Sequence, residues 1–361
     1  MKEKLKLVAV TKNDIKKALA ENTYWQESKY IPFSKSKAAW LLRNDRIDDN
    51  DVCAILGLEG QILVSFIFMI PDIIRTENGL RKIYWSLRWW VIDKHKDTIL
   101  PTYTRKKSLK AINNQIIVRY LGEEVEAFYE KQPFTKVGSR RRFFIVFSLD
   151  ANLILLKKPT LHFLKPILKF FEKLSFKTIQ ILNKRIASKK KGVYTYQYLE
   201  ELDNETWEFL KQHTIDDIVP KTMEYVNWQI DNTQYENIES NSQKHICLVG
   251  SISNKIGNTS LSILVKGTVV GFLSYYINGS EFIVRYFVFD NDFRSICVDA
   301  LMENFIKSNS IVLQTENDFL GQEIKKRYHK IFSREKNIVS LVHNDLNINA
   351  LTIRDHDGQF A

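Results

Sequence analysis

The sequence predicts a mixed α/β protein made of two similar domains, 1–150 and 203–350, joined by a basic helical segment at 151–202. The chain has 361 residues, more than one domain usually contains, and 44% of them are hydrophobic, which is sufficient for a substantial core. Each half holds one long aromatic strand pattern, at 82–92 and at 281–289. Because the order of predicted elements around these strands also recurs, we expect a duplicated fold.

The first half begins with a predicted strand and two helices, for which Asn13 or Asp14 and Ser34 or Ser36 are suitable N-caps. Apolar, β-branched runs separated by turn residues then predict antiparallel strands. In chain order, the elements expected next are strands at 52–58, 62–70 and 82–92, a helix at 101–112 and a strand at 115–120.

A short helix and a further strand complete this half. The helical pattern begins at Val125 and continues through Phe128, and Pro133 ends it because proline cannot continue a helix. The last strand is expected at 142–149.

The second half repeats the order. It predicts helices at 204–212 and 219–230, strands at 245–252, 260–265, 268–277 and 281–289, a helix at 296–308, a strand at 311–314, a helix at 320–332 and a strand at 338–343. In this comparison Trp228 corresponds to Trp40, and Tyr328 corresponds to Tyr129. Residues 351–361 are expected to form a polar tail.

Positive charge is concentrated between the two halves. Residues 157–191 contain eleven Lys or Arg and one acidic residue, Glu172, and so carry ten of the eleven net positive charges of the chain. Apolar residues recur on one helical face: Ile167, Leu168, Phe171, Leu174, Ile179, Leu182 and Ile186. This pattern fits a linker helix packed on a domain, contact of residues 161–191 with an anionic membrane, or contact with RNA or another anionic partner.

The cysteines and the N-terminus indicate the compartment. Cys53, Cys247 and Cys297 lie far apart and form no CxxC pair, so we expect no disulfide framework and a reducing, cytoplasmic environment. The N-terminal apolar run is too short for a signal peptide, and no run approaches the roughly 18 apolar residues of a membrane span.

Several familiar kinds of site are excluded because the sequence lacks their motifs. The sequence has no Gly-x-Gly-x-x-Gly, no Walker loop and no Gly-x-Ser-x-Gly elbow. Its seven histidines lack metal-ligand spacing, and Asp355, Asp357 and Gly358 are too few for a calcium loop, so we expect no metal.

The helix that contains Tyr129 resembles the C-terminal signature of the GNAT superfamily of acyl-CoA N-acyltransferases. In that signature a strand leads into Ala-x-Tyr-Glu-Lys followed by x-Gly-Phe, and here the run is Ala127, Phe128, Tyr129, Glu130, Lys131, Gln132, Pro133 and Phe134. The order of elements in both halves also matches the family. The resemblance implies two tandem GNAT-like domains and acetyl-CoA or another acyl-CoA as donor.

The resemblance also implies a site in the first half. In the family, free backbone groups of the splayed fourth strand bind the pantetheine arm, and the next helix N-terminus binds the pyrophosphate. The implied donor-binding residues are Trp90, Val91, Ile92, Lys94, His95, Lys96 and Thr98. Tyr129 would protonate the leaving thiolate, since a phenol with a pKa of about 10 holds its proton at neutral pH. The expected acceptor is an amine, either an amino sugar or a small amine of envelope polysaccharide.

The phosphate loops leave two alternatives open. Neither residues 93–98 nor residues 291–295 contain the glycines that the family uses there. Aminoacyl-tRNA-dependent peptidyltransferases, which also pair two GNAT-like domains, would have tRNA as partner. A degenerate pair of domains would bind a ligand without catalysis.

Overall fold

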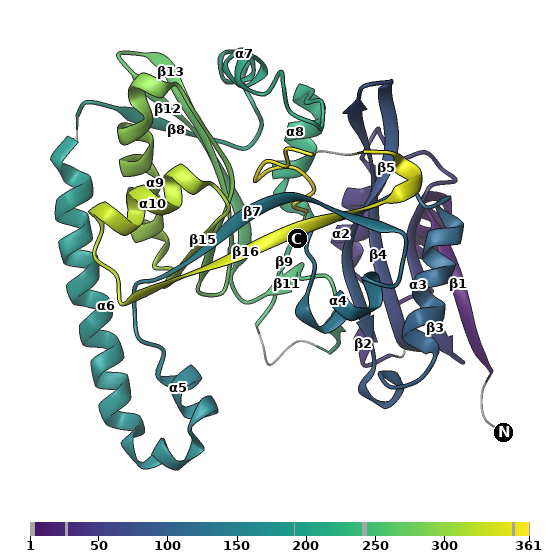
Figure 1. Cartoon of the computed structure of the whole chain (residues 1–361). Helices are drawn as coiled ribbons and strands as arrows, with labels where there is room; N and C mark the ends of the chain where they lie inside the picture. The colour runs from purple at the N-terminus through teal and green to yellow at the C-terminus, as the bar shows by residue number, and fades with distance from the viewer. Residues whose placement is uncertain (1–3, 26–27, 191, 240–243, 349–350, 361) are drawn as a thin grey trace.

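A single mixed sheet of twelve strands runs through the whole protein, with helices packed on its faces (Figure 1). This architecture is seen in a computed structural model that describes residues 4–25, 28–190, 192–239, 244–348 and 351–360. The predicted mixed α/β class is confirmed.

The first half closely follows the predicted order. Its elements are β1 (Leu5–Thr11), α1 (Lys12–Glu21), β2 (Tyr30–Ile31), α2 (Lys35–Leu42), β3 (Val52–Glu59), β4 (Ile62–Thr76), β5 (Gly79–Val91), η1 (Asp93–His95), α3 (Leu100–Ala111), β6 (Ile116–Val118), α4 (Glu123–Tyr129) and β7 (Phe134–Val146). The hydroxyl group of Thr11 caps α1 in place of the expected Asn13 or Asp14. The hydroxyl group of Ser34, one of the two expected residues, caps α2.

The basic segment and the second half follow. Their elements are α5 (Ala151–Lys157), η2 (Pro159–Leu164), α6 (Lys165–Ala187), η3 (Ser188–Lys190), β8 (Thr195–Leu199), α7 (Asn204–His213), α8 (Met223–Ile230), η4 (Asn232–Gln234), β9 (Glu236–Asn237), β10 (Ile246–Cys247), β11 (Ile252–Ser253), β12 (Ile256–Val265), β13 (Thr268–Asn278), β14 (Glu281–Phe289), η6 (Asn291–Phe293), α9 (Arg294–Ser308), β15 (Val312–Thr315), α10 (Asp318–Arg327), β16 (Phe332–His343) and η7 (Asn344–Leu346).

Several elements of the second half differ from their expected bounds. The strand expected at 245–252 is limited to the short strands β10 and β11, and the helix expected at 219–230 begins at Met223. The helix expected at 320–332 ends at Arg327, because the backbone of Tyr328 is extended and the chain then enters β16. The expected linker contains a strand, β8, which pairs with β12 at the edge of the sheet.

The last strand of each half lies in the sheet of the other half. The strand order is β1-β3-β4-β5-β6-β16-β7-β15-β14-β13-β12-β8, so β16 pairs with β6 and β7 pairs with β15. β7 and β16 pair with each other along their whole length, from Phe332 opposite Val146 to His343 opposite Phe134 (Figure 1). The halves are therefore not closed bodies, since each needs a strand from the other to complete its sheet.

Two corresponding tryptophans meet between the halves. The rings of Trp40 and Trp228 stack with centroids 4.0 Å apart, and both side chains are buried. Each indole N–H donates to the backbone carbonyl of the other residue, over 2.6 and 2.9 Å. This reciprocal contact joins α2 to α8 and reflects the duplicated order seen in the sequence.

The C-terminal segment is buried rather than a polar tail. Leu351, Ile353, Asp357 and Phe360 are buried. The buried guanidinium of Arg119 donates to the carbonyls of residues 354, 355 and 357. The segment therefore packs against both halves.

We expect a cut between the halves to leave them together. A protease site inserted between Gly192 and Val193 should be cleaved into two fragments that co-elute on gel filtration, because each half would otherwise expose the edge of β6 or β15. The uncut insertion variant is the control. Separation of the fragments without denaturant would contradict the exchanged strands.

Candidate functional site

Two gaps open in the sheet where a parallel pair of strands separates. β5 pairs with β6 only over residues 84–86, and β14 pairs with β15 only over residues 281–283. Just beyond, Leu87 and Arg285 are extra residues relative to β4 and β13. Such β-bulges bend a strand away from its neighbour. Both gaps lie at the carboxyl ends of parallel strands, where open α/β sheets bind ligands.

Aromatic side chains fill the gap of the first half. The ring of Trp89 lies edge-on to Phe128 and Tyr129, with centroids 5.2 and 6.3 Å apart. Tyr129 is only 4% exposed and also contacts Phe134. The structure thus places the tyrosine of the sequence signature beside the gap, within a packed aromatic cluster.

A buried arginine accompanies this tyrosine. The guanidinium of Arg105 lies 5.2 Å from the centre of the Tyr129 ring and donates to Ser86 Oγ over 3.2 Å, while its Nε and Nη2 make no close hydrogen bond within the described part of the chain. Burial raises the pKa of Tyr129, and the Arg105 charge only partly opposes it. The phenol therefore keeps its proton at neutral pH.

The donor-binding residues expected from the sequence do not converge on one open space. Trp90 packs on Tyr30 with ring centroids 4.7 Å apart, and Val91 is buried. The backbone N–H of Ile92 donates to the carbonyl of Val64 on β4 over 2.9 Å.

The basic side chains of the loop after β5 are already paired. Lys94 and His95 both contact the carboxylate of Glu59, and Lys96 pairs with Asp93. Thr98 donates to the carbonyl of His95. A phosphate at this loop would compete with these carboxylates.

The gap of the second half opens into a cavity of about 690 Å³. Phe287, Val288 and Phe289 line it from the free end of β14. Phe287 lies as far beyond the last β14–β15 pair as Trp90 lies beyond the last β5–β6 pair. Two of the donor-binding residues expected from the sequence, Trp90 and Val91, occupy the corresponding part of β5 in the first half.

A helix N-terminus adjoins this cavity. Asn291, the first residue of η6, which leads into α9, lines the cavity and is exposed. Phe293, the residue before α9, makes no side-chain capping hydrogen bond. An uncapped N-terminus of a long helix favours an anion such as a phosphate.

Charged side chains from both halves meet at the inner wall of the cavity. Glu316, which follows β15, is buried and accepts from Arg119, Arg140 and Arg142, with the closest contact at 2.7 Å. Tyr120 also donates to it over 2.7 Å. Burial disfavours its charge, but the three guanidinium groups outweigh burial and lower the pKa of Glu316.

Asp355 lines the same cavity beside Glu316. Burial and then the Glu316 carboxylate raise the pKa of Asp355 to about 7, although Arg119 opposes this shift. The hydroxyl of Thr315 donates to Asp355 Oδ2 over 3.3 Å. A carboxylate with a pKa near neutrality is suited to general base catalysis.

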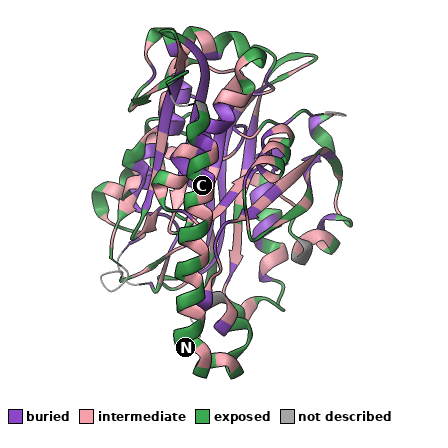
Figure 2. Ribbon diagram, turned by 90° about the vertical axis from the view of Figure 1, so that its left-hand side faces the viewer, coloured by how far each residue is buried: buried purple, intermediate pink, exposed green. Residues whose placement is uncertain are grey.

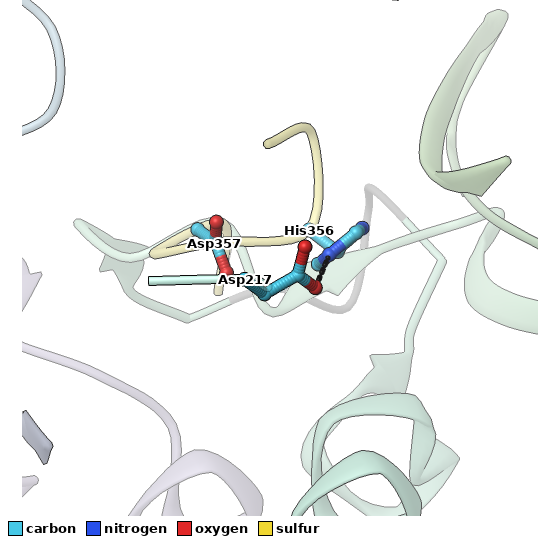
Figure 3. Close-up of side chains that lie close together, drawn as sticks. All are labelled: Asp217, His356 and Asp357. Carbon is cyan, nitrogen blue, oxygen red and sulfur yellow. Dashed lines mark hydrogen bonds and ion pairs between the residues drawn. The ribbon is translucent and has the colours of Figure 1, made fainter. Parts of the chain in front are cut away.

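A second acid–base pair lies at the cavity wall (Figure 3). His356 Nε2 lies 2.6 Å from Asp217 Oδ2, and the other ring nitrogen points away from that carboxylate. The His356 ring stacks on Tyr286 with centroids 4.4 Å apart.

Asp217, His356 and Asp357 each offer one metal-ligand atom, and these atoms lie within 4.8 Å of one another. However, Asp357 already accepts from Lys221 Nζ over 2.6 Å and from the Arg354 N–H over 2.9 Å. A cation would have to displace the Lys221 ammonium, so the arrangement fits an ion-pair network.

Tyr328, the counterpart of Tyr129, is buried away from the cavity lining. Its hydroxyl donates to Asp299 Oδ1 over 2.6 Å, and burial followed by this bond raises its pKa. The sequence analysis also missed the roles of Glu316, Asp355 and His356. The only signal for them was the cluster of Asp, His and Gly at 355–358, which by itself resembles no known ligand loop.

Comparison with solved structures identifies the fold. A tandem GNAT protein from the clavulanic acid biosynthesis pathway matches with a TM-score of 0.51 and 7% identity, covering 94% of this chain and 98% of that one. The N-myristoyltransferase of Saccharomyces cerevisiae, with bound myristoyl-CoA, matches with a TM-score of 0.52 and 12% identity, covering 94% and 79%. No family model matches the chain, and no curated protein matches it by sequence.

The chain therefore has the GNAT fold, in two tandem copies, as the sequence resemblance predicted. Among the described residues, no helix is both long and apolar enough to cross a lipid bilayer.

We expect Asp355→Asn to alter how stability depends on pH. Between the unfolded pKa of about 3.9 and the folded value of about 7, the folded protein holds a proton that the unfolded chain releases. The contribution of Asp355 to stability therefore falls as pH rises through this window. The Tm of the variant should gain on that of the wild type between pH 4.5 and 7.5, as measured by differential scanning calorimetry.

The exposed Asp292→Asn variant controls for loss of a carboxylate at the surface. A Tm difference for Asp355→Asn that stays constant with pH would show that this carboxyl has an ordinary pKa in the folded protein.

Proposed function

We propose that the protein is an acyl-CoA-dependent N-acyltransferase whose donor binds at the gap between β14 and β15. The observation that supports this most strongly is the cavity of about 690 Å³ at that gap, since the gap of the first half is filled by rings. The free end of β14 offers backbone groups to the pantetheine arm, and the positive end of the α9 helix dipole favours the pyrophosphate. The two structural neighbours, a tandem GNAT protein and an N-myristoyltransferase with bound myristoyl-CoA, support this assignment.

The residues of the cavity suit the transfer of an acyl group to an amine. Asp355 accepts a proton from the amine as the new N–C bond forms and the C–S bond of the thioester breaks. Arg140, held by Glu316, stabilises negative charge as it develops on the carbonyl oxygen and the leaving thiolate. The released thiolate takes up one proton, which balances the proton that Asp355 removed from the amine.

The acceptor in this proposal is a polar amine, such as an amino sugar or a small amine of envelope polysaccharide. Carboxylates line the same cavity at Asp217, Glu316 and Asp318, and such groups attract and orient a protonated amine before it is deprotonated.

The first half offers a second candidate site. Tyr129 lies beside the gap between β5 and β6, and the buried Arg105 beside it has N–H groups that make no close hydrogen bond among the described residues. An acyl carbonyl in that gap would satisfy these groups, but the rings of Trp89 and Phe128 would have to move first.

A pair of charge changes distinguishes the two donor sites. Asn291→Glu places a negative charge where phosphates would meet α9, and Lys96→Glu does the same at the corresponding loop of the first half. We expect Asn291→Glu to weaken acetyl-CoA binding by about tenfold or more and Lys96→Glu to leave it nearly unchanged, since like charges repel over a few ångströms. Isothermal titration calorimetry measures both.

The reverse pattern would move the donor to the first half. No binding of acetyl-CoA or of longer acyl-CoAs by the wild type, together with binding of aminoacyl-tRNA, would favour the peptidyltransferase alternative instead.

A matched pair of substitutions tests the chemical step. Asp355→Asn should lower kcat by roughly 10²-fold or more, the usual contribution of a general base, with a small change in donor affinity. Tyr129→Phe, which removes only a hydroxyl, should leave kcat within about threefold, whereas a loss of 10² would assign the general acid to Tyr129 as the sequence signature implies. Each rate is taken per folded molecule, with circular dichroism as the check.

A further inference from the structure

The helical hairpin formed by α5, η2 and α6 extends beyond the edge of the sheet (Figure 1). Only the C-terminal part of α6 is held by the second half, where the side-chain amide of Asn183 donates to the His329 carbonyl over 2.9 Å and Ala187 is buried. The rest of the hairpin contacts mainly itself, as in the bond from the Ala151 N–H to Glu172 Oε2 over 3.2 Å. Its outer face is consequently open to a partner.

Large apolar side chains cover this outer face. Phe163 is 77% exposed and Phe170 is 63% exposed. Ile167, Phe171 and Leu174 are also exposed, and at about 100° per residue they share with Phe170 a sector roughly 100° wide on α6. Figure 2 shows α6 facing the viewer, with exposed positions along much of its length. A contiguous apolar surface of this size marks an interaction site.

Lysines border the apolar stripe. Lys173, Lys177 and Lys184 are exposed along one side of it, and Lys157, Lys158 and Lys165 are exposed near the tip of the hairpin. Glu172 is the single acidic residue of the segment, and it already pairs with Lys169 over 3.0 Å. The surface is therefore both apolar and strongly cationic.

We propose that the outer face of the α5–η2–α6 hairpin docks on an anionic lipid bilayer. The aromatic and aliphatic side chains enter the acyl boundary, and the lysines pair with lipid headgroups, which is how basic amphipathic helices lie in an interface. Pairing with a second copy of the chain is disfavoured, because it would bring two cationic faces together. Docking on a bilayer requires no rearrangement of the sheet, since the hairpin already extends beyond the edge of the sheet.

Vesicle co-sedimentation of the full chain tests this surface. We expect binding to vesicles of phosphatidylcholine with about one third phosphatidylglycerol, and much weaker binding to phosphatidylcholine alone. Phe170→Ser/Phe171→Ser and, separately, Lys173→Glu/Lys177→Glu should each lower the partition coefficient about tenfold or more. Added NaCl at about 0.5 M should weaken binding of the wild type, because it screens the lysines.

Matched variants on α3 serve as controls. Ile99→Ser/Tyr103→Ser and Lys106→Glu/Lys107→Glu change exposed residues of the same kinds in the first half and should leave binding unchanged. Equal loss in the control variants, or no binding of the wild type to anionic vesicles, would overturn the proposal. Dimerisation abolished by Phe170→Ser/Phe171→Ser, seen by analytical ultracentrifugation without vesicle binding, would assign the face to a second copy.

Discussion

The pairing of β7 with β16 is the constraint on which the rest of the structure depends. Because these strands cross between the halves, each half lacks its own last strand and takes that of the other. The exchange brings Arg119, which follows β6, and Glu316, which follows β15, into contact at the centre. A buried carboxylate is tolerated only with cationic partners, and breaking one such pair typically costs about 3–5 kcal/mol. The central ion network and the exchanged strands therefore stabilise the same arrangement.

The two gaps of the sheet arise in the same way, but different side chains surround them. Both arise from a bulge just beyond the last pair of a parallel ladder. In the first half the residue beyond the bulge is followed by Trp89, whose ring packs with α4 and fills the space. In the second half Tyr286 instead stacks on His356 of the C-terminal segment, and the cavity beside it remains open. The site is composite, since β7 and the C-terminal segment line a gap that β14 and β15 create.

The positive charge of the protein is distributed in two ways. Ten of the eleven net charges lie in a segment that adds little to either core, whereas the arginines near the cavity are matched by Glu316, Asp318 and Asp217. Charge that shapes the site is thus balanced locally, and charge that is not balanced lies on the projecting hairpin. The apolar periodicity of α6 was visible in the sequence, but part of its apolar face packs on the protein, as at Ile179 and Ile186, and part does not.

The sequence by itself determined the local structure, the duplication and the fold family. Alternation of apolar residues is set within a few positions, so β3, β5 and β14 fall close to their expected bounds, and the helix with Tyr129 follows β6 as its signature implies. β4 instead continues beyond its expected end at residue 70, to Thr76. Only the tertiary structure decided which strand pairs with which, because β7 and β16 offer similar edges to several partners and the choice is made by contacts nearly 200 residues apart. It also decided the candidate site, since the raised pKa of Asp355 comes from burial and from Glu316, and nothing in the residues around Asp355 encodes either neighbour.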